Sequence, residues 1–161
     1  MRTQVLQKPS VTSILATVSG IGFLLHLAWE YVQCSPFFLH VKVPATISSM
    51  LAAAIGDVLI LWVAYVPVAL YHRSLAWPIH EVHLGGWLSF TFISMALAAV
   101  VEYWSISTGR WNYTDLNPVL KAFGISVLPF AQMLILNPLT IWLTTKFLNW
   151  NQQPYTKEKE R

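Results

Sequence analysis

The sequence predicts an all-α fold, a transmembrane four-helix bundle with both termini in the cytoplasm. The 161 residues are 55% hydrophobic and only 11% charged, whereas an ordinary soluble domain has about 25% charged residues. Four apolar stretches reach about 20 residues, the length that crosses a bilayer. These observations exclude a soluble enzyme, a nucleic-acid-binding protein and a disordered chain.

The expected elements follow from these stretches. The first apolar stretch is longer than the apolar region of a cleavable signal peptide, so we expect it to remain as a membrane span. Short polar or proline-containing connectors separate the stretches. We expect a single transmembrane domain over residues 1–148, followed by a polar C-terminal tail over 149–161. The expected spans are residues 11–32, 47–70, 86–106 and 127–147.

The distribution of Lys and Arg predicts the orientation. Seven of the ten fall in the N-terminal segment, the second connector and the C-terminal segment, and only Lys42, Arg110 and Lys121 fall on the other side. Because cytoplasmic segments of membrane proteins carry the excess of Lys and Arg, both termini are expected inside.

Three acidic residues, Glu30, Asp57 and Glu102, lie within the expected spans. A charged side chain at the centre of a bilayer costs roughly 2.5–3.5 kcal/mol on insertion scales, and such residues usually face the protein interior. In the predicted topology all three lie at or outside the midplane, so we expect them to meet in one pocket. They are the candidate catalytic residues. The alternative is a structural role, in which each acid is simply hydrogen-bonded to a neighbouring helix.

Helical spacing supports this convergence. His26 and Glu30 are four residues apart and therefore share one face of the first helix. Small residues at Ala52 and Gly56 on the second helix have the spacing that permits two helices to approach closely. The fourth span contains Pro138, which frees a backbone carbonyl and predicts a kink; Asn137 beside it would satisfy that carbonyl or face the pocket.

The segment between the third and fourth spans is rich in aromatic residues and contains Arg110. This arginine would pair with Glu102 or Asp57, bind an anionic headgroup, or belong to an aromatic belt at the membrane surface. The candidate ligand-binding residues are His26, Trp29, Trp104, Arg110, Trp111, Tyr113, Gln132 and Asn137.

No metal site and no cofactor are expected. His26 has only Glu30 as a further ligand on its face, and the His80–His83 pair is interpreted as part of a solvated loop. Cys34 is the single cysteine, which excludes an internal disulfide.

Several motifs carry a resemblance. The chain contains HLAWEYVQ followed by Ser35-Pro36, Gly56-Asp57 in the second span, an acid eight residues before RWNY, and a downstream LPFAQ. This pattern resembles an uncharacterised bacterial family of small four-span integral membrane proteins, which implies a bacterial inner-membrane location. The stretch from Glu102 to Pro129 also resembles carotenoid hydratases and lycopene-cyclase-type membrane proteins. The place of the paired acids of the cyclases is taken here by LPFAQ.

That second resemblance implies an intramembrane acid that protonates an isoprenoid double bond. Our first hypothesis is therefore a pocket that binds, or acts on, an apolar lipid or isoprenoid-like molecule entering from the bilayer, with Glu102 or Asp57 as the acid. A component of proton-coupled transport is the second hypothesis. The third is a non-catalytic membrane subunit or assembly factor that binds a partner subunit or a second copy of itself through its acids.

Overall fold

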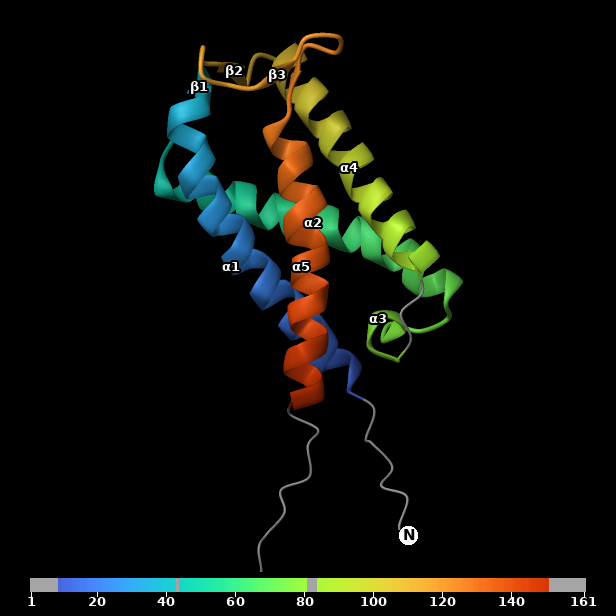
Figure 1. Ribbon diagram of the computed structural model, residues 1–161. Helices are drawn as coiled ribbons and strands as arrows, with labels where there is room; N and C mark the ends of the chain where they lie inside the picture. Colours follow the sequence, from blue (N-terminus) through green and yellow to red (C-terminus); the bar gives the residue numbers. More distant parts are fainter. Residues whose placement is uncertain (1–8, 43, 81–83, 151–161) are drawn as a thin grey trace, which may run out of the picture.

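The computed structural model describes residues 9–42, 44–80 and 84–150, and most of these residues are helical (Figure 1). Within this part of the chain there are four long helices and one short helix. They are α1 (Val11–Phe37), α2 (Ile47–Tyr71), the short α3 (Trp77–His80), α4 (Leu84–Ser107) and α5 (Leu128–Trp150).

Polar side chains fix where the first two helices begin. The Ser10 hydroxyl accepts a hydrogen bond from the Ser13 backbone N–H. Thr46 does the same for Ser49, whose own hydroxyl accepts from the Thr46 N–H and so completes a reciprocal capping box. These bonds satisfy backbone donors that a helix cannot pair internally.

Each long helix packs against two others. Helix α1 contacts α2 and α5, and α4 contacts the same two helices. In Figure 1, α2 crosses steeply behind α1 and α5, so the four axes are not close to parallel. The N-terminal end of α1 and the C-terminal end of α5 lie at the same end of the molecule (Figure 1).

The interior is divided along its length. At the end where α1 begins and α5 finishes, apolar side chains from all four long helices form a closed core. Its fully buried members include Val18, Leu61, Tyr65, Phe90 and Ile141. The opposite end contains polar side chains and a cavity, described below.

Two short strand pairs cover that opposite end, and sequence patterns did not predict them. Strand β1 (Phe38–His40) pairs antiparallel with β2 (Trp111–Tyr113). Strand β3 (Val119–Leu120) pairs with β4 (Ile125–Ser126). The β1–β2 sheet joins the segment after α1 to the segment after α4, so it connects regions more than 70 residues apart in the sequence.

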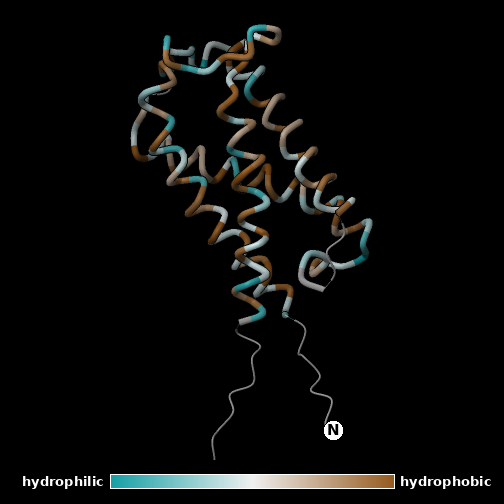
Figure 2. Tube along the Cα trace, viewed as in Figure 1, coloured by the Kyte–Doolittle hydropathy of each residue, from teal (hydrophilic) through white to brown (hydrophobic). Residues whose placement is uncertain are grey.

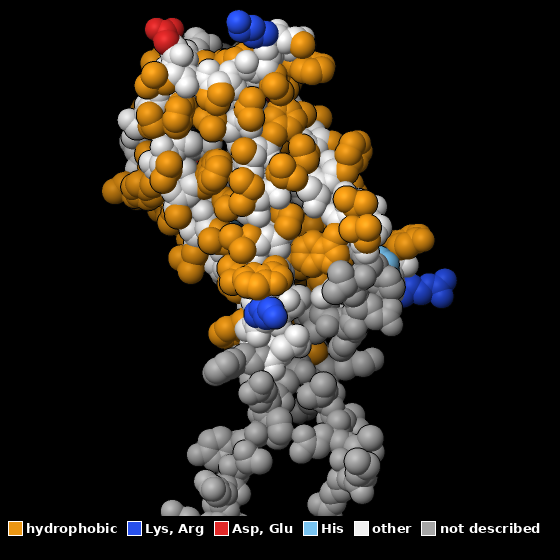
Figure 3. Space-filling view, in the orientation of Figure 1, with side chains coloured by type: hydrophobic (Ala, Val, Ile, Leu, Met, Phe, Trp, Pro, Cys, Tyr) orange, Lys and Arg blue, Asp and Glu red, His pale blue; other side chains and the backbone are white. Residues whose placement is uncertain are grey.

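The surface is that of a membrane protein. Helices α1, α2 and α4 are each long and apolar enough to cross a bilayer. Helix α5 has 23 residues but is less apolar, because Gln132, Asn137 and two prolines interrupt it. Hydrophobic positions run along all the long helices (Figure 2), and on the face in Figure 3 the charged side chains lie at the two ends of a hydrophobic band.

The helix bounds agree with the expected spans, with one clear difference. Helix α1 continues to Phe37, five residues beyond the expected end at Val32. Pro36 lies within this last turn and leaves the Val32 carbonyl without its usual helical donor. Most of the expected tail (residues 151–161), together with Glu81 and His83, lies outside the described residues, as does the side chain of His80.

Neighbouring glycines at the start of α4 provide a test of the packing. An alanine Cβ at Gly86 would lie 2.9 Å from His72 Nε2 and 3.0 Å from the Trp77 ring, whereas one at Gly85 would meet nothing within 4 Å. The His72 ring stacks on Trp77, which is itself buried, so neither ring can easily move aside.

Gly86→Ala is therefore expected to destabilise the protein by about 1–3 kcal/mol. Gly85→Ala should be neutral or stabilise by up to about 1 kcal/mol, because alanine favours helix. Thermal unfolding of the two variants in detergent measures the difference, and equal melting temperatures would show that the packing around Gly86 is wrong.

Candidate functional site

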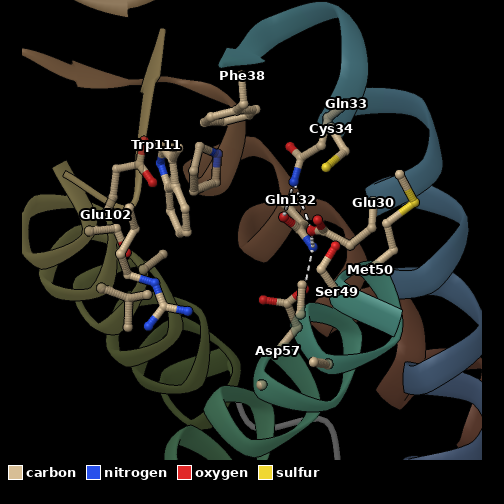
Figure 4. A pocket seen from close by; sticks show the side chains of 18 of the residues that line it. Glu30, Gln33, Cys34, Phe38, Ser49, Met50, Asp57, Glu102, Trp111 and Gln132 are labelled. Atoms are coloured by element: carbon tan, nitrogen blue, oxygen red, sulfur yellow. Dashed lines mark hydrogen bonds between the residues drawn. The ribbon is translucent and has the colours of Figure 1, made fainter. Parts of the chain in front are cut away.

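A cavity of about 370 Å³ lies beneath the β1–β2 sheet, between all four long helices (Figure 4). Most of its wall is apolar, and four of the seven α2 residues in the wall (Ser49, Ala52, Ala53 and Gly56) are small. The wall residues used below are Glu30, Gln33, Cys34, His40, Ala52, Ala53, Gly56, Asp57, Val101, Glu102, Trp104, Ser105, Arg110, Trp111 and Gln132.

The structure brings the three intramembrane acids to this one cavity. Glu30 and Glu102 are 8% and 2% exposed, and the Asp57 side chain is 15% exposed. In Figure 4, Glu30 and Asp57 lie together near Gln132, while Glu102 lies across the cavity beside Trp111. The acids thus form a pair and a separate single group.

Gln132 links the acidic pair. Its side-chain nitrogen lies 2.7 Å from Asp57 Oδ2, 3.4 Å from Glu30 Oε1 and 3.0 Å from His26 Nδ1. An amide nitrogen has two hydrogens, so it cannot donate fully to all three acceptors. The bond to Glu30 is the longest, and Glu30 receives a second, shorter bond of 2.8 Å from Gln33.

A chain of hydrogen bonds continues from His26 into α5 and α4. His26 Nε2 lies 3.0 Å from Asn137 Oδ1, and Asn137 Nδ2 donates to Ser94 Oγ at 3.0 Å. Because the amide oxygen only accepts, His26 carries its hydrogen on Nε2, and its Nδ1 accepts from Gln132. The Ser94 hydroxyl donates to the Phe90 carbonyl and ends the chain. Every member except Asp57 is almost completely buried.

Two of the predicted residues act through neighbours. The Trp29 indole N–H donates to Gln33 Oε1 at 2.7 Å, which orients the Gln33 amide nitrogen toward Glu30 and Gln132. Asn137 was predicted to satisfy a freed carbonyl or face the pocket; instead it hydrogen-bonds to His26, Ser94 and the Met133 sulfur.

Glu102 is held from outside the helices. The Tyr113 hydroxyl donates to Glu102 Oε1 at 2.6 Å and accepts from the Ser126 backbone N–H at 3.0 Å. Burial, and then the bond to Glu102, raise the pKa of Tyr113 above its ordinary value, so the phenol stays protonated and remains a donor at neutral pH. Tyr113 lies in β2, so the β1–β2 sheet positions Glu102.

Arg110 reaches the cavity through the C-terminal turn of α4. The Arg110 N–H donates to the Ser105 carbonyl at 2.9 Å, and the Gly109 N–H donates to the Ile106 carbonyl at 3.0 Å. Gly109 has φ +65°. This is a Schellman motif, which requires a left-handed residue and folds the next residue back over the last helical turn.

The guanidinium of Arg110 lies over the Trp104 ring, 4.9 Å from its centre. The expected pairing with Glu102 or Asp57 is not present, since the described residues place no carboxylate within 4.0 Å of Arg110. The physical reason is the Schellman turn, which sets the guanidinium over Trp104 instead.

The cavity is not closed along its α2 and α4 sides. Four of its wall residues, Ala52 and Ala53 on α2 and Val101 and Trp104 on α4, are exposed. The small residues Ala52 and Gly56 were expected to bring two helices together. Instead they face the cavity, and a Cβ at Gly56 would meet nothing within 4 Å.

The sequence-predicted residues therefore fall into two groups. Seven line the cavity: Glu30, Asp57, Glu102, Trp104, Arg110, Trp111 and Gln132. Four do not line it but support those that do: His26, Trp29, Tyr113 and Asn137.

Sequence reasoning missed Gln33, Cys34, His40 and Ser105 as wall residues. Gln33 and Ser105 share helix faces with Glu30 and Glu102, and that spacing was an available signal. His40 lies 2.9 Å from the Cys34 sulfur only because of the strand pairing, which no sequence pattern indicated.

Comparison of the chain with models of known families, with curated proteins and with solved structures returned no match. Within the described ranges, no group of three or more His, Cys, Asp or Glu side chains is arranged to hold a metal ion. The function of the chain is therefore inferred from the geometry of the cavity.

Gln132→Met tests the polar network. Removing the amide leaves Asp57 without its closest donor and weakens the support of Glu30, and an unsatisfied buried acceptor costs about 1–3 kcal/mol. We expect a loss of about 2–4 kcal/mol in unfolding free energy, measured by thermal unfolding in detergent. Ile135→Met, at an exposed position of the same helix, is the control. Equal stability of the two variants would contradict the network.

Proposed function

We propose that the chain is an integral protein of the bacterial inner membrane that binds an apolar lipid or isoprenoid-like molecule in this cavity. In this proposal α5 also spans, so that the four long helices form a transmembrane bundle with cytoplasmic termini. Two observations support that orientation. The start of α1 and the end of α5 lie at the same end of the molecule (Figure 1), and the connectors at the opposite end contain only three cations, Lys42, Arg110 and Lys121.

The observation that carries the proposal is the lateral mouth. A mouth between α2 and α4 that is bordered by exposed apolar side chains would face lipid tails rather than water. A volume of about 370 Å³ is within the range of about 300–1,000 Å³ that small-molecule pockets occupy. A mostly apolar wall with a few convergent polar groups is the usual composition of such pockets.

A catalytic step, where one occurs, is proposed to use Glu102. The resemblance to carotenoid hydratases and lycopene cyclases implies protonation of a double bond by an intramembrane acid. Glu102 lies on the cavity wall with Trp104 and Trp111. The aromatic face of Trp111 would stabilise the cation that protonation produces. Asp57 and Glu30 are less suited, because they lie across the cavity from Trp111 (Figure 4).

The arrangement gives less support to proton-coupled transport. A proton path needs groups that both take up and release protons, yet the network from His26 continues through the amide of Asn137. Beyond it lies the apolar core around Val18, Leu61 and Ile141. Among the described residues of that core, Tyr65 is the one titratable side chain, and its hydroxyl donates to the Leu75 carbonyl and not to the network.

Replacement of the acids distinguishes a site from structural support. Asp57→Asn and Glu102→Gln keep an acceptor oxygen for Gln132 and Tyr113, so we expect both variants to insert, remain monodisperse and melt within about 1 kcal/mol of the parent. Bound lipid, measured by mass spectrometry of extracts of the purified protein, is expected to change in amount or in chemical form. Failure of both variants to fold would assign the acids a structural role, such as holding a partner subunit.

Filling the cavity tests the ligand itself. Gly56→Leu places a large side chain in the cavity and should reduce copurified lipid at least tenfold. Gly20→Leu is the matched control, because Gly20 is also helical with nothing within 4 Å, but does not line the cavity. Equal lipid retention in the two variants would refute binding at this cavity.

A further inference from the structure

One part of the cavity wall has polar atoms that the described residues leave without hydrogen bonds. They are Ser105 Oγ, Arg110 Nε and Trp111 Nε1, and all three atoms are buried. Their residues all line the cavity. The Trp111 indole N–H is directed at Glu102 as a side-chain hydrogen-bond donor, so Ser105 and Arg110 are the two residues whose atoms lack a partner. Buried polar groups are normally paired, and exceptions at a cavity wall indicate a missing partner.

Local backbone geometry explains why these groups are neighbours. Ser105 is 0% exposed and lies in the last turns of α4. The Schellman motif bonds the Arg110 N–H to the Ser105 carbonyl, so the two residues are adjacent although they are five positions apart. Trp111 follows directly and begins β2.

The chemistry of these atoms defines what they would bind. The Arg110 and Trp111 nitrogens can only donate, and the Ser105 hydroxyl can donate or accept. Their common partner must therefore be an acceptor. A carbonyl oxygen has two lone pairs and no hydrogen, so it can accept from two of these donors at once.

The charges of the cavity favour a neutral acceptor over an anion. Three carboxyl groups and one guanidinium line the wall, so acids outnumber the single cation. A carboxylate or phosphate headgroup would place one more acid in a mostly apolar site, where burying an additional charge is costly.

From this we infer that the ligand is a carbonyl-bearing lipid, a long-chain or isoprenoid ketone or aldehyde. Its oxygen accepts hydrogen bonds from Ser105 and Arg110. Its apolar chain lies along Ala53 and Gly56 and leaves through the mouth between α2 and α4. This inference rests on the proposed function and adds the chemical class of the ligand.

The experiment compares four molecules with the same 17-carbon chain, namely heptadecane, 2-heptadecanol, 2-heptadecanone and heptadecanoate. Each is titrated against the purified full chain in detergent, and binding is followed by native mass spectrometry. We expect the ketone to bind about fivefold or more tightly than the hydrocarbon, and more tightly than the alcohol and the acid. One hydrogen bond of about 1 kcal/mol corresponds to about fivefold in affinity.

Ser105→Ala removes only the hydroxyl and should reduce ketone affinity about fivefold while hydrocarbon affinity is unchanged. Ser107→Ala is the control, since the exposed Ser107 hydroxyl bonds to the Trp104 carbonyl and does not line the cavity. Arg110→Lys, which keeps the charge but loses the Nε donor, should act like Ser105→Ala.

Tightest binding by heptadecanoate would overturn the inference in favour of an anion site. An unchanged ratio of ketone to hydrocarbon affinity in Ser105→Ala would overturn it as well, but would leave lipid binding intact. Absence of binding by all four molecules would instead overturn the proposed function itself, and Gly56→Leu separates these cases because it should abolish binding of every chain.

Discussion

The amide of Gln132 is the contact on which the polar half of the molecule depends. It joins Asp57 on α2, His26 and Glu30 on α1, and its own helix α5 within hydrogen-bond distance. In an apolar medium no water is available to replace a missing partner. Helices α1, α2 and α5 are therefore held at the one separation where these side chains satisfy each other, and Asn137 extends the same constraint to α4 through Ser94.

This constraint also explains why a cavity persists at one end of the helices and a closed core at the other. Large side chains such as Tyr65 and Phe90 fill the core end. At the polar end three of the α2 wall residues, Ala52, Ala53 and Gly56, are too small to reach across. The β1–β2 sheet covers this end of the cavity, where Phe38, His40 and Trp111 belong to its wall.

Helical periodicity accounts for much of what the sequence predicted. The spacing of His26 and Glu30 placed them correctly on the buried face of α1. Three of the four expected spans coincide with helices that are long and apolar enough to cross a bilayer. The strand pairs were not predictable, because β1 and β2 have three residues each and are separated in the sequence by three helices, α2, α3 and α4. Their pairing depends on where α1 and α4 end in space. The position of Arg110 over Trp104 likewise follows from the left-handed Gly109, and the charge pattern alone favoured a carboxylate partner.

The two acidic environments differ in what their partners can do with a proton. Glu30 and Asp57 share an amide donor, which fixes their positions but neither takes up nor releases a proton near neutral pH. Glu102 has a phenol, which donates to it while accepting from the Ser126 backbone. A hydroxyl can reverse its bond when the acid changes protonation state, and an amide nitrogen cannot. Groups held in contrasting environments generally take different roles in a site. Within the proposed function, this difference favours Glu102, which lines the cavity with Trp104 and Trp111, as the acid for any proton transfer to a ligand.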